Sequence, residues 1–156
     1  MTERLRILVD SRRVEVHPAA DDEVAFLWEK AVRTLRSSRA GVLAGVVDID
    51  SAFSLAYQSA FQGSTAVLRA AGYRAVGRDH HHSTFAGVAA LEAGDLSRAA
   101  RDVNEMRQDR HDAVYGTTPI EAAQLDEMHE AARRLLSAAH AWIAETRPTL
   151  KLTPPG

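Results

Sequence analysis

Apolar side chains recur every three or four residues through most of this chain, from Asp21 to Pro148. That spacing aligns them along one side of an α-helix, whereas a half-buried strand would alternate apolar and polar residues. The pattern is interrupted near four glycines, Gly45, Gly72, Gly94 and Gly116. Helices joined by short links pack as antiparallel neighbours, so we predict an all-α fold, an up-and-down bundle of about five helices.

The expected helix ends carry start signals. Asp21 or Asp22 is expected to cap the first helix, and Asp48 or Asp50 the second, because a carboxylate accepts the free N–H groups of a first turn. The last helix starts at Thr118, followed by a proline in the first turn and a glutamate three residues on, the pattern of a capping box. The predicted helices cover residues 21–41, 48–72, 83–92, 96–115 and 118–147.

The bundle is expected to occupy residues 21–147, with less regular segments at both ends. Residues 1–20 are predicted to be an N-terminal extension, a strap or short hairpin, because Leu5–Val9 and Val14–Val16 are apolar and partly β-branched. The tail of residues 148–156 ends in two prolines and a glycine, and we expect it to be flexible.

Composition narrows the class of protein. The 156 residues include no cysteine, which excludes disulfide frameworks and cysteine zinc sites. The sequence has no apolar run of membrane-spanning length and no signal-peptide pattern at its start, so we expect a cytoplasmic protein with no membrane partner. A formal net charge of −2 gives no overall attraction to nucleic acid, so any phosphate-binding surface must be local.

One arginine interrupts the apolar side of the predicted fourth helix. The apolar positions there are Leu96, Ala99, Val103 and Met106, and the next position in the same register is Arg110. A buried guanidinium without a partner is costly. Arg110 must therefore pair with an acidic residue, emerge at a subunit interface or face a pocket that binds an anion.

Arg107, His111 and Tyr115 follow one another at intervals of four residues along an adjacent face of that helix. Side chains at this spacing lie one above another, so they could line a groove. The alternative is structural: Arg107 and Arg110 pair with neighbouring acids, and Tyr115 packs against the helix end. Ion-pair networks of that kind are more common than functional sites.

Three consecutive histidines, His80 to His82, invite a metal-site interpretation. Adjacent residues of a loop rarely converge on one ion, and the sequence has no Glu-x-x-His pair of the kind found in di-iron bundles. We therefore predict neither a metal nor a cofactor. The histidines are expected instead at the entry to the third helix, with His82 or Ser83 as its cap.

Several segments together resemble the HEPN domains. They are the helix of residues 51–73, the loop with His82–Phe85, and the arginine-rich helix that ends in Tyr115, and the resemblance covers most of residues 21–146. The resemblance implies an up-and-down helical bundle that is commonly homodimeric.

The family signature is an arginine, a polar residue, several variable residues and then a histidine. Arg110 matches the arginine and His111 the polar residue, whereas Tyr115 stands in the place of the histidine, as in a variant branch that this chain resembles. A tyrosine of ordinary pKa, about 10, is ionised in only ~0.1% of molecules at pH 7, so it is a poor general base.

The resemblance also implies two classes of function. Many family members are metal-independent endoribonucleases of toxin–antitoxin or defence systems, which leads us to expect RNA or nucleotide phosphate bound by Arg107 and Arg110. Arg110, His111 and Tyr115 would then be the catalytic set, with activity weakened or lost. Other members are non-catalytic, so the alternative is a protein-interaction module that partners a nucleotidyltransferase or another antitoxin-like protein.

Overall fold

The computed structural model describes residues 1–156 apart from the side chain of Ala113. The prediction of an all-α bundle with a short N-terminal extension is confirmed. In chain order the elements are α1 (Glu3–Asp10), β1 (Val14–Val16), α2 (Asp21–Leu43), α3 (Ile49–Ala71), β2 (Tyr73–Ala75), α4 (His80–Ala90), α5 (Asp95–Glu105), α6 (Arg107–Tyr115) and α7 (Ala122–Thr146).

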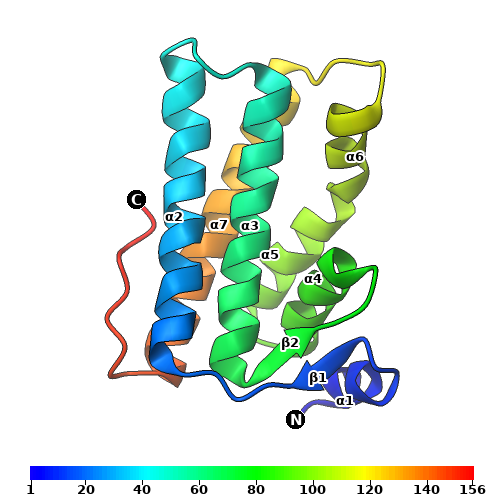
Figure 1. Ribbon diagram of the computed structural model, residues 1–156, viewed down its shortest axis with the longest axis vertical. Helices are drawn as coiled ribbons and strands as arrows, with labels where there is room; N and C mark the ends of the chain where they lie inside the picture. Colours follow the sequence, from blue (N-terminus) through cyan, green and yellow to red (C-terminus); the bar gives the residue numbers. More distant parts are fainter.

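The long helices α2, α3 and α7 run side by side, and α3 packs against both of the others (Figure 1). On the other side of α3, α4 and α5 pack at one end of the bundle and α6 continues toward the other end. The core between the helices is apolar, and its largest side chains, among them Trp28, Phe53, Phe85 and Leu136, are removed from solvent. Burying each such side chain contributes roughly 1.5–3 kcal/mol.

Helix α3 begins and ends where its sequence signals predict. The side chain of Asp48 accepts a hydrogen bond from the backbone N–H of Ser51 at 2.7 Å. At the other end, Gly72 adopts a φ of 89°, a left-handed conformation that favours glycine at a helix C-terminus. The predicted aspartate cap of α2 is wrong, because Ala20 is its N-cap residue and provides no side-chain hydrogen bond.

The last helix begins later than predicted. The capping box that stabilises α7 joins Glu121 and Gln124, so the box predicted at Thr118 is wrong. The residues before it serve another purpose: the backbone N–H of Ile120 donates to the carboxylate of Asp50 at 2.8 Å, and the Ile120 side chain is buried in the core. This contact fixes the connection between α6 and α7 against the start of α3.

The prediction that Leu5–Val9 form a short strand or an irregular strap is wrong, because these residues belong to helix α1. Thr2 caps it by accepting a hydrogen bond from the Leu5 N–H at 3.1 Å, and Leu5 and Leu8, three residues apart, are buried on one face. The strand expected at Val14–Val16 is present, but its antiparallel partner is β2, which the sequence reasoning did not predict.

The C-terminal residues run back along the bundle beside α2 (Figure 1). The indole N–H of Trp28 donates to the carbonyl of Thr153 at 2.7 Å, and Leu150 and Leu152 pack against the core. Flexibility was predicted for residues 148–156, but these contacts hold the segment in place.

The arginine-rich segment is two helices instead of the single one predicted over 96–115. Helix α5 ends at Glu105, the N–H of the next residue, Met106, bonds to the carbonyl of Val103 in a tight turn, and α6 begins at Arg107. The break redirects the chain so that α6 packs against α3. Across the described chain, no helix combines the length and apolar character needed to cross a membrane.

Gly63 allows α3 and α7 to approach closely, because a Cβ atom placed there would lie 2.4 Å from Cδ2 of the buried Leu136. We expect Gly63→Val to destabilise the fold by about 1–3 kcal/mol through overpacking. Chemical denaturation measures the change. Ser37→Val, at an exposed position of α2, is the control, and equal effects of the two substitutions would contradict this account of the contact.

Candidate functional site

Arg110, on helix α6, lies against an aromatic ring of helix α3. Its guanidinium carbon is 5.1 Å from the centre of the Tyr57 ring of α3, the geometry of a cation–π contact. Its Nε atom is buried and has no hydrogen-bond partner. Among the described residues, no carboxylate lies within ion-pair distance of Arg110. Pairing with an acid, the structural alternative for this residue, is therefore not what the structure shows.

Tyr57 is fully buried beneath Arg110, and its hydroxyl group has no hydrogen-bond partner. Burial raises the pKa of Tyr57 to about 12, because an ionised phenolate would lose its hydration. The hydroxyl therefore keeps its proton at neutral pH and remains a hydrogen-bond donor. Fewer than about one in ten buried polar groups lacks a partner in folded proteins, so a free hydroxyl beside a free guanidinium is unusual.

His81, in the first turn of α4, extends this group of rings. Its ring stacks on Phe61 at 3.9 Å between centres and lies nearly parallel to that of Tyr57 at 6.1 Å. Its Nδ1 atom is also buried without a partner. Burial, helped by the charges of His80 and Arg110, lowers the pKa of His81 to about 4, so the imidazole is neutral at pH 7.

The three adjacent histidines diverge, because successive side chains of a helix point about 100° apart. His80 meets the edge of the Phe61 ring, and His82 bonds through Nδ1 to the side-chain amide of Asn104 at 2.9 Å. In the described part of the chain, no group of three or more metal-ligating side chains gathers. The predicted capping by His82 or Ser83 is wrong, since α4 already begins at His80 after Asp79.

The residues predicted as a site all lie on α6, but they do not form one cluster. Arg107 is exposed and pairs with Asp79 at 3.0 Å, as the structural alternative predicted for it. His111 and Tyr115 lie on the exposed side with ring centres 5.1 Å apart. Within the described structure, no hydrogen bond or ring contact joins that pair to Arg110, which turns toward α3.

Sequence reasoning missed the two residues that accompany Arg110. Tyr57 carries a usable signal: it lies between Phe53 and Phe61 at intervals of four on the apolar face of α3, so its hydroxyl had to enter the core. His81 carries no such signal, because which of three neighbouring histidines turns inward depends on where α4 begins.

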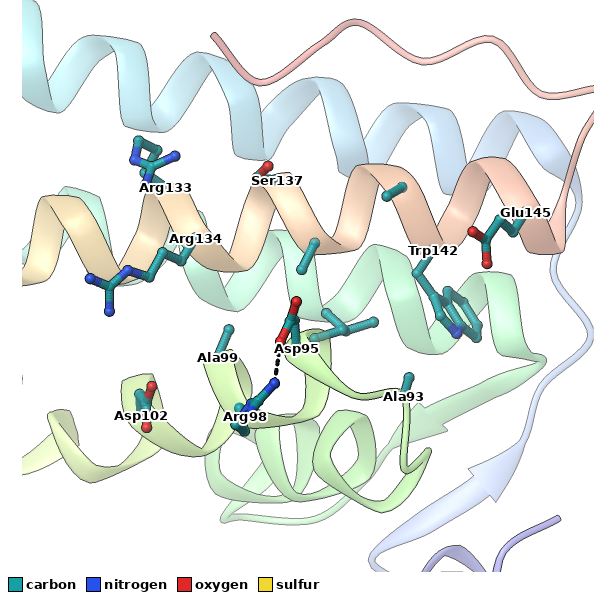
Figure 2. A pocket seen from close by; sticks show the side chains of 13 residues that line it. Ala93, Asp95, Arg98, Ala99, Asp102, Arg133, Arg134, Ser137, Trp142 and Glu145 are labelled. Atoms are coloured by element: carbon teal, nitrogen blue, oxygen red, sulfur yellow. Dashed lines mark hydrogen bonds and ion pairs between the residues drawn. The ribbon is translucent and has the colours of Figure 1, made fainter.

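A hollow of about 720 Å³ lies away from Arg110, between α5 and α7 (Figure 2). It also contains arginines, but these are already neutralised. Arg98 pairs with Asp95. Arg133 and Arg134 both pair with Glu130, which Figure 2 does not label, at 2.7 Å and 3.2 Å. This contrast makes Arg110 the better candidate for binding an anion.

Fold and site together define a class: an all-α bundle in which an arginine lies in the seam between helices and has no carboxylate partner among the described residues. The chain matches the family model of the HEPN domain over residues 24–144, which is most of its length, and it belongs to that family. The resemblance noted in the sequence is thereby confirmed. No match is found among curated proteins or among solved structures.

The environment of His81 gives a test of the site's geometry. Because its pKa in the folded protein, about 4, lies below the ordinary value of 6.5, the folded state resists protonation. The contribution of His81 to stability is thus complete above about pH 6.5 and is lost as the pH falls toward 4. We expect the His81 ring signals to titrate near pH 4 in NMR spectra, compared with those of His81→Phe for assignment. A midpoint at 6 or above would contradict the burial described.

Proposed function

We propose that this protein binds RNA or nucleotide phosphate, with Arg110 as the principal phosphate contact. The observation that carries the proposal is that the Arg110 guanidinium has no carboxylate partner among the described residues, while Asp79 already engages its neighbour Arg107. A guanidinium offers several N–H donors in one plane, a geometry that suits phosphate oxygens. The cation–π contact with Tyr57 helps to position the guanidinium without neutralising its charge.

The exposed residues of α6 extend this surface. Arg107 can exchange its exposed partner Asp79 for a phosphate, and the paired rings of His111 and Tyr115 can donate further hydrogen bonds. We further propose a homodimer in which two α6 helices face a common groove, as membership of the HEPN family favours.

Cleavage of the bound RNA requires two groups in addition to binding. A base must take the proton of a ribose 2′-hydroxyl, and a cation must stabilise the charge that develops on the phosphate. Arg110 can supply the cation, but Tyr115 replaces the imidazole of the family signature and is 73% exposed. We therefore propose that metal-independent endoribonuclease activity is weak or lost, and that binding is the main function.

A second candidate is a protein-interaction module, for example for a nucleotidyltransferase-type partner. Its support is apolar surface at one end of the bundle, where the α2–α3 connection and the end of α6 both lie (Figure 1). Leu43 there is 88% exposed and Val46 is 79% exposed. This candidate replaces the first if the protein fails to bind RNA at low salt.

One prediction of the proposed function concerns Arg110→Ala. Loss of a charge-assisted contact costs about 1.5–3 kcal/mol, so the affinity for a short single-stranded RNA should fall about 10- to 150-fold. Each lost phosphate contact should also reduce the slope of log affinity against log salt by about 0.7. Gel-shift titrations at several salt concentrations measure both.

Arg98→Ala is the matched control, because Arg98 is an exposed arginine that already pairs with Asp95. It should leave the affinity close to that of the wild type. RNA binding that is equally sensitive to both substitutions, or insensitive to Arg110→Ala, would contradict the assignment of Arg110.

A second prediction restores the imidazole of the family signature. Tyr115→His should increase RNA cleavage in the presence of a metal chelator by about 100-fold, because general base catalysis contributes at least that much. The fragments are measured on denaturing gels. The double variant Tyr115→His/Arg110→Ala should return to the background rate, and cleavage that survives in it would place the chemistry elsewhere.

A further inference from the structure

A small hollow of about 220 Å³ lies beside the rings of the proposed phosphate site, between α2, α3 and α4. Phe61 and His80 line it, and Phe61 also stacks on His81. His81 in turn lies parallel to Tyr57, and the Arg110 guanidinium lies over Tyr57, so a row of ring contacts connects the hollow with the proposed phosphate site. A ligand that reaches both would combine a charged group with a flat one.

Gln62 gives this hollow an unsatisfied hydrogen-bonding group. The residue lines the hollow and is only 6% exposed, and its Oε1 atom is buried without a hydrogen-bond partner. An unsatisfied buried carbonyl costs about 1–3 kcal/mol. A ligand with an N–H group would satisfy this carbonyl.

Among the other residues that line the hollow, some already have partners and others can contact a ligand. Arg69 is engaged, because its Nε donates to Glu23 at 2.7 Å and its Nη1 donates to the carbonyl of Tyr73. The rings of Phe61 and His80 meet edge to face at 5.8 Å and form an aromatic wall. Such walls bind the unstacked bases of single-stranded RNA, and amide side chains bind base edges.

We propose that this hollow binds a nucleobase of the RNA or nucleotide whose phosphate Arg110 contacts, with Gln62 bonding to the edge of the base. The inference rests on the proposed function for its phosphate half. The base half rests on the aromatic wall and on the unpartnered Gln62 carbonyl, both of which are independent of Arg110. Because the rings of Phe61 and His80 stand 68° apart, the base would stack on one of them and meet the other at its edge.

Two probes separate the base from the phosphate: adenosine 5′-monophosphate and ribose 5-phosphate, which carries the same sugar and phosphate without a base. Stacking of one base contributes roughly 1–3 kcal/mol, so the wild-type protein should bind the nucleotide about 5- to 150-fold more tightly. Titrations followed by NMR measure both affinities. In the wild-type protein, the Gln62 side-chain amide signals should move with the nucleotide and not with ribose 5-phosphate.

Variants complete the test. Gln62→Met should weaken binding of the nucleotide and leave ribose 5-phosphate unchanged, whereas Arg110→Ala should weaken both. Gln58→Met changes another amide of the same hollow that is less buried, and it should leave nucleotide binding close to the wild-type value.

The outcomes distinguish the two proposals. Equal wild-type affinities for the two probes, or Gln62 signals that do not respond to the nucleotide, would overturn the base site and leave the phosphate site standing. Nucleotide binding that depends on Gln62 and not on Arg110 would support the base site and overturn the proposed phosphate contact. If neither probe binds, both proposals are overturned.

Discussion

The packing of α3 between α2 and α7 is the constraint on which the rest of the structure depends. The close approach at Gly63 sets how near α7 can lie, and the aromatic side chains of the same helix fill the core. Because its neighbours cover much of α3, two of its larger polar residues, Tyr57 and Gln62, are buried. The hydroxyl of Tyr57 and the side-chain carbonyl of Gln62 are therefore buried by the fold itself, and neither has a hydrogen-bond partner among the described residues.

The proposed site follows from that enclosure. Helix α6 offers a guanidinium to the face of a buried ring, and α4 adds an imidazole that burial keeps neutral. Each group pays a desolvation cost that an ordinary core residue would avoid. Proteins retain such arrangements where a ligand later satisfies the unpaired groups, and perturbed side chains gathered in one place are typical of functional sites.

The sequence predicted the fold better than the site. Apolar periodicity located the long helices, and Asp48 and Gly72 marked the ends of α3, because both signals are local. Arg110 was identified as anomalous for the same reason. The break at Met106 and the helical start at His80 depend on packing between distant segments, so their consequences for Arg110 and His81 could not be derived from spacing alone. The strand β2 was missed because three residues carry too little pattern to identify a strand.

The anchored C-terminal segment has a practical consequence for handling the protein. Trp28 and the core fix this segment beside α2, while α6 lies on the other side of α3 (Figure 1). A purification tag or fluorescent protein joined after Gly156 would consequently emerge away from the side of α6 that carries Arg107 and Arg110, and would leave that side open to a nucleic acid. The protein can therefore be immobilised through its C-terminus, provided that the residues around Thr153 are kept.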